Sequence, residues 1–166
     1  MSVNRPNLRR IFAISVLLAS SAIAAPASAA DPTPANTAAG VVRLDSSHSV
    51  DETVARIKTA VESKGIRYFT AIDQKALGDS ADLSIRRSTL VMFGNPPLGV
   101  QFIQGNPYAA LDWPVRMLVR EKADGTTEIA WTDFAYIGQR YGLTDLDAQL
   151  KMATEVASLI ANEAGQ

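Results

Sequence analysis

The chain contains no cysteine and only one histidine among its 166 residues. The missing thiols exclude disulfide bonds, thiolate zinc sites, cysteine nucleophiles and iron–sulfur clusters. The single imidazole, His48, cannot by itself supply the several ligands that a zinc site needs. We therefore expect no metal site and no cofactor.

The chain also lacks an excess of charge of one sign. Its 16 Lys and Arg residues stand against 17 Asp and Glu residues, which gives a formal net charge of −1. Phosphate-backbone binding depends on a basic excess, so we expect no nucleic-acid partner. Residues 94–99 include two glycines but no Lys, Ser or Thr, so this segment does not have the composition of a phosphate-binding loop.

The first thirty residues have the pattern of a cleaved signal peptide. Residues 1–10 carry three arginines and no acid, and residues 11–25 carry no charge. Small residues then precede Asp31, which suits cleavage after Ala30. The apolar run is shorter than the about 20 residues that span a membrane. We therefore expect an exported protein, periplasmic or extracellular, with no stable membrane span after cleavage.

Two export routes fit this segment. Arg9, Arg10 and Phe12 have the spacing of a twin-arginine signal, but the residues that follow depart from that motif, so the Sec route is favoured. Removing 30 of the 166 residues leaves 136, and removing three of the 16 bases and none of the 17 acids leaves a net charge of −4. Residues 31–40 hold two prolines and no large apolar residue, which predicts a disordered leader before a single domain at 41–166.

Hydrophobic periodicity predicts two long helices and five strands in the order β-α-β-β-β-β-α. The predicted strands are 41–44, 67–72, 88–93, 115–121 and 128–132. The first long helix is predicted at 50–64 and the second after 144–147, with a loop or short turn in 73–86 and one or two short helical turns in 98–111. This order predicts an α+β fold, with one mostly antiparallel sheet and both long helices packed on one face.

Local signals support the helix ends. Ser49 and Glu52 have capping-box spacing, in which each side chain bonds to the other residue's backbone N–H, and Gly65 suits the end of the same helix. Thr144 and Asp147 have the same spacing before the last helix. Strict alternation over 67–72 predicts a set of side chains on one face of that strand: Tyr68, Thr70 and Ile72.

Three polar residues stand where connections leave the predicted sheet: Asp73, Asn95 and Asp112. Binding residues concentrate in such connections, so these three are candidate ligand-binding residues. Turn chemistry is the alternative for each, because Asp and Asn side chains bond readily to their own backbone. Convergence of the three side chains in space would favour a binding site.

His48 and Arg116 complete the set of candidate ligand-binding residues, and no residue is predicted to be catalytic. His48 stands among Ser and Asp residues, and its alternative role is that of a residue at a helix entry. Arg116 shares a strand face with Arg120, and arginine suits the capture of a carboxylate or phosphate. Alternatively, the two arginines keep an edge strand charged against pairing with another chain. Aromatic residues that could line a pocket, a dimer seam or the core are Phe93, Phe102, Tyr108, Trp113 and Trp131.

Six features carry a resemblance to a known family: Ser49–Thr53, Gly65, Ile72–Asp73, Phe93–Pro96, Ala110–Pro114 and Arg140–Leu143. Together they resemble the family called domain of unknown function 302, over about residues 42–143. The resemblance implies a fold of the TATA-box-binding-protein-like type and a homodimer, and it implies no particular reaction. Family members often have histidine at the positions of Gln74 and Tyr141, so this chain lacks two imidazoles that a metal or haem site could use.

Three functions from different classes remain open. The favoured one is a homodimeric binding module for a small apolar or anionic ligand. The alternatives are a structural or interaction protein of the cell envelope without a ligand, and an acid–base or hydrolytic enzyme using Asp73, Asp112 and His48. An apolar pocket of about 300 Å³ or more would support the first. A flat exposed apolar patch would support the second, and convergence of the three polar side chains would support the third.

Overall fold

The computed structural model describes Met1 and residues 39–166. The predicted signal peptide, residues 1–30, and the predicted leader up to residue 38 lie outside the described residues. Gly40, which the leader prediction included, belongs to the fold, because its carbonyl accepts a hydrogen bond of 2.7 Å from the backbone N–H of Asp133. The prediction of a disordered segment is therefore wrong at its last position.

Five strands form one antiparallel sheet in the order β1-β5-β4-β3-β2. Their bounds are β1 Val41–Ser46, β2 Arg67–Asp73, β3 Ser88–Gly94, β4 Val115–Glu121 and β5 Thr127–Thr132. β4 and β5 are joined by the tight Asp124-Gly125 turn, in which Gly125 has a φ of +82°. In this strand order, β1 and β2 are the two edge strands and β4 lies at the centre.

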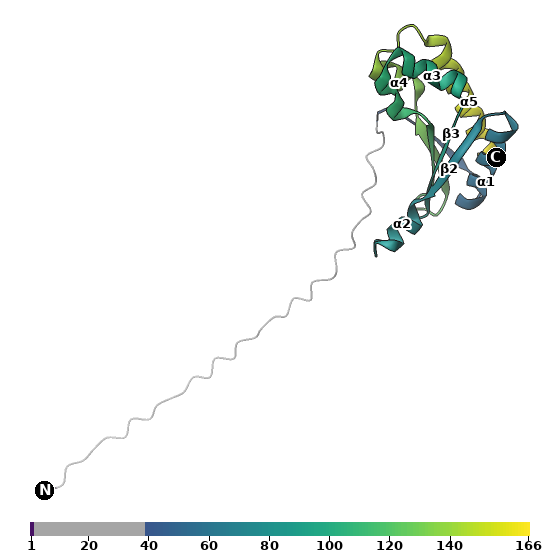
Figure 1. The fold of residues 1–166 in the computed structure, drawn as a ribbon. Coiled ribbons are helices and arrows are strands. Elements are labelled where there is room, and N and C mark those ends of the chain that lie inside the picture. The colour runs from purple at the N-terminus through teal and green to yellow at the C-terminus, as the bar shows by residue number, and fades with distance from the viewer. Residues whose placement is uncertain (2–38) are drawn as a thin grey trace. The chain divides into compact units, whose positions relative to one another are not determined.

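Two long helices, α1 (Val50–Ser63) and α5 (Asp147–Gly165), cover one face of this sheet. α1 packs on α5 and on β2, β3 and β4, and α5 also packs on β1 (Figure 1). The predicted α+β class, strand order along the chain and helix placement are confirmed. In the described part of the chain, no helix combines the length and apolar composition that a membrane crossing requires.

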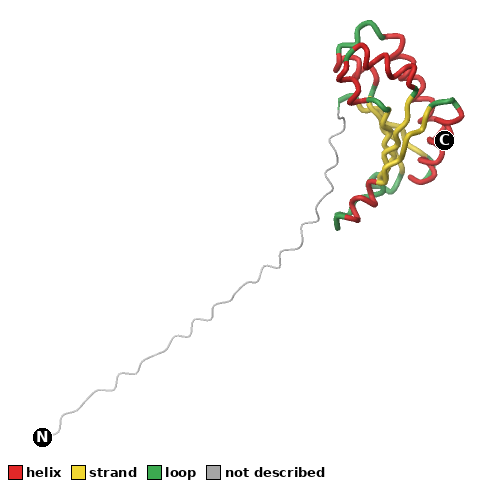
Figure 2. The backbone as a smooth tube through the Cα atoms, viewed as in Figure 1, coloured by secondary structure: helices red, strands yellow, loops and turns green. Residues whose placement is uncertain are grey.

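Four shorter helices lie in the connections: α2 (Gln74–Ser80), α3 (Pro96–Gly105), the 3₁₀ helix η1 (Pro107–Asp112) and α4 (Phe134–Tyr141). α3 and α4 gather at one end of the sheet and α2 projects at the other (Figures 1 and 2). α3 is longer than the expected turns, because Pro96 occupies the first helical position, where its missing N–H costs nothing. α4 was not predicted at all.

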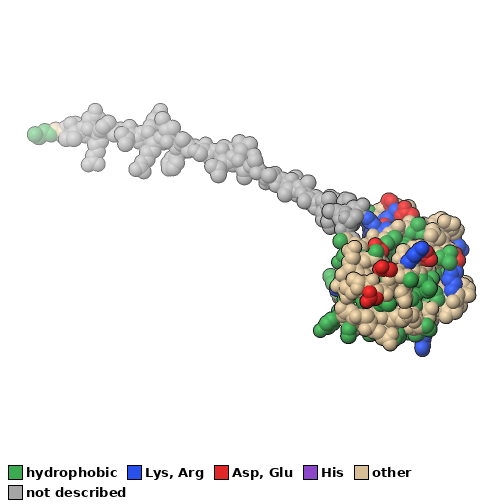
Figure 3. Space-filling view, turned by 90° about the horizontal axis from the view of Figure 1, so that it is seen from above, with side chains coloured by type: hydrophobic (Ala, Val, Ile, Leu, Met, Phe, Trp, Pro, Cys, Tyr) green, Lys and Arg blue, Asp and Glu red, His purple; other side chains and the backbone are tan. Residues whose placement is uncertain are grey.

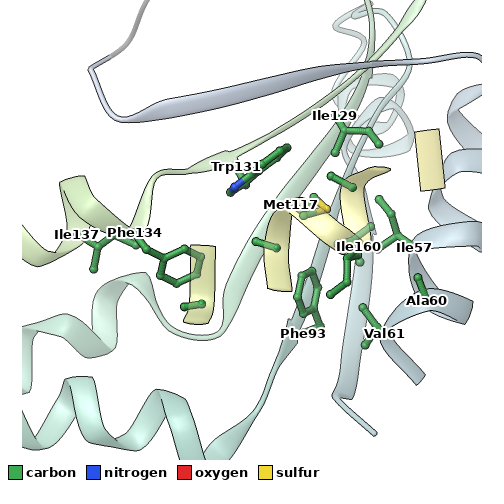
Figure 4. Close-up of a cluster of buried hydrophobic side chains, with 14 of the residues drawn as sticks. Ile57, Ala60, Val61, Phe93, Met117, Ile129, Trp131, Phe134, Ile137 and Ile160 are labelled. Atoms are coloured by element: carbon green, nitrogen blue, oxygen red, sulfur yellow. The ribbon is translucent and has the colours of Figure 1, made fainter. Parts of the chain in front are cut away.

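The core lies between the sheet and its two long helices. Alternate residues of the three inner strands point into it, including Phe93 of β3, Met117 of β4 and Ile129 of β5. Ile57 of α1 and Ile160 of α5 meet them from the helix side (Figure 4). Because successive strand residues face opposite ways, the residues between these core positions lie on the other face of the sheet.

β2 departs from strict alternation. A bulge between Tyr68 and Thr70 leaves Phe69 without a partner in the register, and Tyr68 and Ala71 both pack against the core. The predicted shared face of Tyr68, Thr70 and Ile72 is therefore wrong, since a bulge shifts the pleat by one residue. The bulged Phe69 ring packs edge-on against Trp113, with ring centroids 6.0 Å apart.

The helix starts follow the predicted signals only in part. Ser49 Oγ accepts a hydrogen bond of 3.3 Å from the Glu52 N–H, as expected of a cap. The Glu52 carboxylate instead accepts from His48 Nδ1 at 2.9 Å. α5 begins at Asp147 after Leu146, which makes no side-chain cap bond, so the second capping box is wrong. Leu146 is partly buried and packs against the core.

Candidate functional site

The face of the sheet opposite α1 and α5, called here the open face, carries an apolar row that crosses its inner strands. Ile72, Leu90, Leu118 and Ala130 are successive cross-strand partners, and Arg43 of β1 ends the row. Directly opposed side chains on one face lie about 5 Å apart, so these apolar groups are continuous. Ile72 is exposed and the two leucines are half-buried.

A cluster of charged and polar side chains lies at the end of the open face near α4. It consists of Asp112, Arg116, Arg140 and Tyr141, and is called the Asp112 cluster below. The Asp112 side chain is only 6% exposed. Its Oδ1 pairs with Arg116, while its Oδ2 accepts from Arg140 Nη1 at 3.2 Å and from the Tyr141 hydroxyl at 2.7 Å. One buried carboxylate therefore holds three donors.

Three separate elements bring these groups together. Asp112 is the last residue of η1, and Arg116 follows at the start of β4. Arg140 and Tyr141 lie in the last turn of α4, which ends at Gly142 in the left-handed conformation with a φ of +63°. Asn106 ties the two helices, because its side-chain amide donates to the Tyr141 carbonyl at 2.9 Å. Arg140 and Tyr141 thus contact the Asp112 carboxylate although they lie 28 and 29 residues further along the chain.

The cluster carries a net positive charge, since two guanidinium groups surround one carboxylate. The Arg116 and Arg140 side chains are 43% and 49% exposed. Each guanidinium has five N–H donors, so both can bond to a further acceptor while holding Asp112. The hydrogen bond to Asp112 raises the pKa of Tyr141, with burial acting in the same direction and the two arginines opposing it. The tyrosine therefore stays a neutral donor at ordinary pH.

The structure brings together two of the five predicted site residues by direct contact. Asp112 and Arg116 form an ion pair. Asn95 follows β3 at the same end of the sheet and precedes α3, where its side chain makes no cap bond. The interpretation of Arg116 as the guard of an edge strand is wrong, because β4 is the central strand.

The other two predicted residues have local roles. Asp73 caps α2, with its carboxylate accepting from the Ala76 N–H at 2.9 Å. His48 lies at the entry to α1, where its side chain is 19% exposed and bonds to Glu52. Its Nε2 atom is buried without a partner among the described residues. Both positions match the alternative roles of turn and helix-entry residues.

Asp112 lies far from both of these residues. Asp73 pairs with Thr89, and Thr89 pairs in turn with Val119, near the end of β4. Asp112 lies before the start of β4, at Val115. Four residues of strand from 115 to 119 already span about 13 Å. His48 follows Ser46, which lies at the same far end of the sheet as the turn between β4 and β5. The three groups of the predicted enzyme therefore do not converge on one substrate.

The two positions at which family members often have histidine are also far apart. Gln74 accepts a hydrogen bond of 2.6 Å from Ser88, at the start of β3. Tyr141 bonds to Asp112 at the opposite end of the sheet. Imidazoles at these positions would not share one site within a chain. Among the described residues, no group of three or more His, Asp or Glu side chains could hold a metal ion.

The partly open hollow beside Trp113 is too small for a ligand. It measures about 40 Å³ and is lined by apolar groups of the sheet, α3 and α5, among them Phe93, Phe102 and Phe134. Trp113 lies so close to α3 that a Cβ on Gly99 would come within 1.8 Å of its Nε1. The pocket is therefore mostly filled by the indole, and it falls well short of the about 300 Å³ of a small-molecule site.

A larger hollow of about 570 Å³ lies between α4 and α5, and it is open to solvent. Gly138 and Leu150 form its floor, and Gln139, Thr144 and Lys151 are among its polar rim. Around the end of the molecule that carries α3 and α4, acidic, basic and apolar side chains are mixed (Figure 3). The hollow has no group comparable with the buried carboxylate of the Asp112 cluster, which makes the cluster the stronger candidate site.

Sequence reasoning missed Arg140 and Tyr141. Both belong to a segment that carries the family resemblance, yet nothing in their spacing points to Asp112. The aromatic residues that were expected to line a pocket, a dimer seam or the core differ in their burial. Phe93, Phe102 and Trp131 are buried, whereas Tyr108 is 73% exposed.

Known proteins resemble this chain in sequence and in fold. Two fluoride-specific ion channel proteins, FluC 1 of Brucella suis biovar 1 and FluC 1 of Brucella abortus biovar 1, are 35% identical over 104 residues. That is 63% of this chain but only 41% and 38% of those proteins. A crystal structure of an uncharacterized conserved DUF302 protein from Bacillus stearothermophilus is 14% identical and has the same fold, with a TM-score of 0.70 over 76% of this chain and 99% of that one. Residues 42–162 match the family described as domain of unknown function DUF302, and the chain belongs to that family.

Proposed function

We propose that this protein is a homodimeric binding module that holds a small apolar or anionic ligand at the open face. The observation that carries the proposal is the Asp112 cluster, in which Arg116 and Arg140 are half exposed and exceed the charge of the one carboxylate between them. Arginine binds carboxylate and phosphate groups through its paired donors.

The neighbourhood of the cluster supports a ligand with an apolar part. Arg116 and Leu118 lie two residues apart on the same face of β4, which is about 7 Å. Leu118 begins the run of side chains that continues through Leu90 to Ile72. An anionic head at the arginines would therefore place an attached apolar group on the row.

The dye 8-anilinonaphthalene-1-sulfonate is a suitable probe, because it joins an anion to an apolar ring system. We expect its fluorescence titration to saturate with the wild-type protein and to weaken about tenfold in the double variant Arg116→Gln/Arg140→Gln. Lys151→Gln removes the same kind of charge at an exposed position of α5 and should leave binding unchanged. Equal affinities for the double variant and the control would refute the site.

The predicted export is part of this proposal and has its own test. Mass spectrometry of the protein from the periplasmic fraction should give a chain that begins at Asp31. A chain that keeps Met1 and stays in the cytoplasm would contradict export. Arg9→Lys/Arg10→Lys should leave export intact if the Sec route is used and block it if the twin-arginine route is used.

A second candidate function is that of an interaction module for a fluoride channel. It is supported by the Brucella relatives, which are named as fluoride-specific ion channels and are more than twice as long as the part that this chain matches. A truncated Brucella suis channel without the matched 104 residues should then regain fluoride efflux when this chain is supplied with it. A fluoride electrode would follow efflux from vesicles, and no gain over the truncated channel alone would refute this candidate.

A further inference from the structure

A β-bulge turns Phe69 onto the open face. β2 is an edge strand and lies beside β3 (Figure 1). Tyr68 and Ala71 both pack against the core, so the two residues between them, Phe69 and Thr70, lie on the opposite side of the strand. In a regular strand Phe69 would face the same way as Ala71 and enter the core. Phe69 is instead 38% exposed, so the bulge presents an aromatic ring on the open face.

The indole of Trp113 packs against this ring. The two ring centroids lie 6.0 Å apart at an interplanar angle of 79°, the edge-to-face arrangement that aromatic pairs prefer. Gly94 makes room for the indole, because a Cβ at this position would lie 3.1 Å from Trp113 Nε1. Gly94 follows the core residue Phe93, so the space that it leaves is on the open face. Phe69 and Trp113, called the aromatic wall, thus stand at the end of the open face that carries the Asp112 cluster.

Met92 connects the aromatic wall with the Asp112 cluster. In the strand register Met92 pairs with Thr70 of β2 and with Arg116 of β4, and it is half-buried. Adjacent strands are about 4.8 Å apart, so a ring lying on Met92 would be about 5 Å from each of these two strands. Aromatic rings pair at centroid distances of about 4.5–7 Å, and a guanidinium attracts a ring within about 6 Å. Phe69 and Arg116 can therefore both contact a ring that rests on Met92.

The same end of the open face has more basic than acidic groups. They are Arg67, Arg116, Arg140, Asp112 and Asp133, which gives a net charge of +1. The Asp133 carboxylate already accepts a hydrogen bond of 3.0 Å from the Ala135 N–H as the cap of α4. The Arg67 guanidinium lies 5.5 Å from the centroid of the Phe69 ring. The charge next to the aromatic wall thus favours an anion.

We propose that the ligand of the open face is an aromatic acid, whose ring rests on Met92 against the aromatic wall and whose anionic group is bound by Arg116 and Arg140. The inference rests on the proposed ligand site and names the class of its ligand. Phe69 is then a specificity-determining residue, because it offers a ring contact that an aliphatic acid on the apolar row does not use. Arginine adds to this preference, since a guanidinium also stacks on aromatic faces.

Two acids with one carbon skeleton test the class of the ligand. Naphthalene-2-carboxylate and decahydronaphthalene-2-carboxylate carry the same charge, and the saturated acid is no less apolar, so burial of apolar area alone would not favour the aromatic one. Isothermal titration of the wild-type protein should give about fivefold tighter binding of the aromatic acid, the value of a well-formed ring contact. Equal or weaker binding of the aromatic acid would overturn the inference.

Phe69→Leu removes the ring and keeps an apolar side chain. The ratio of the two dissociation constants should fall to about one in this variant, whereas Phe69→Tyr keeps a ring and should keep the preference. Tyr108→Leu is the matched control, because it removes a ring that is 73% exposed and lies outside the aromatic wall. It should retain the wild-type ratio. Circular dichroism of each variant checks that the domain is folded.

The methionine methyl groups report the position of the ring without reference to affinity. The chain has four methionines, and Met92→Leu identifies the signal of Met92 in a spectrum of carbon-13-labelled methyl groups. Ring currents of naphthalene-2-carboxylate should move this signal upfield, and the saturated acid should not. Met152, which is 54% exposed on α5, is the control. A saturating aromatic acid that moves the Met152 signal, or leaves that of Met92 in place, would show that the ring lies elsewhere.

The outcomes separate this inference from the proposed function. If neither acid binds the wild type, the ligand site and the inference both fail. If both acids bind equally and Arg116→Gln/Arg140→Gln weakens both, the site stands and only the aromatic class fails. A preference that persists in Phe69→Leu would refute the part given to the aromatic wall.

Discussion

Replacing Asp112 by alanine should destabilise the domain and at the same time strengthen anion binding. The Asp112 side chain is only 6% exposed. Its carboxylate accepts hydrogen bonds from Arg116, Arg140 and Tyr141. The two ion pairs contribute little each, because both guanidinium groups are about half exposed to water. Most of the effect comes from removing a charged acceptor at a buried position, so we expect a loss of about 2 kcal/mol.

This loss is large enough to measure in several ways. For a domain of this size it corresponds to a fall in Tm of about 8 °C, and urea unfolding can be followed by the fluorescence of Trp113 and Trp131. Asp145→Ala, at an exposed loop position, provides the control. A stability of Asp112→Ala within about 0.5 kcal/mol of that control would refute the role given to the carboxylate.

The same variant should act in the opposite direction on ligand binding. Without the carboxylate the two arginines lose their internal acceptor, and the cluster gains one unit of positive charge. We expect the dye titration to become about threefold tighter, in line with the free energy of one surface charge pair. A variant that is both less stable and weaker in binding would show that Asp112 positions the arginines rather than neutralising them.

Gly99→Ala places a Cβ 1.8 Å from Trp113 Nε1, and we expect a loss of about 2 kcal/mol in thermal unfolding, which an unchanged Tm would contradict. The pKa of Tyr141 is raised by its hydrogen bond to Asp112, so the folded state favours the neutral phenol. The stabilisation from this bond is complete below the unfolded pKa of about 10 and is lost as pH rises through the higher folded pKa. Tyr141→Phe should therefore remove a phenol that ionises above the usual range of tyrosine in an ultraviolet titration, and an unchanged high-pH part of the curve would contradict this assignment.

Much of the fold could be predicted because it depends on neighbours in the chain. Alternation over 115–121 identifies Met117 and Val119 as core residues, and both are fully buried. Ser49 marks the start of α1 through a bond three residues away. α4 escaped prediction because its eight residues span only two turns, too few for a helical period to stand out.

The candidate site could be predicted only at its local members. Asp112 and Arg116 lie four residues apart. Asp112 was predicted because it stands where a connection leaves the sheet, and Arg116 because arginine suits the capture of an anion. Arg140 and Tyr141 lie 28 and 29 residues further on, and their contact with Asp112 depends on how α4 packs beside η1. No periodicity within the chain records that packing.

By itself the sequence determined the elements and their order, which follow from short-range sterics, capping and the burial of alternating apolar side chains. It also determined that the chain has no thiol and no excess of basic residues. Only the tertiary structure decided which polar residues meet. The strand order β1-β5-β4-β3-β2 places β4 at the centre and separates Asp112 from Asp73 and His48. It joins Asp112 to Arg140 and Tyr141 instead, because long-range packing, and not distance along the chain, determines which side chains share one end of a sheet.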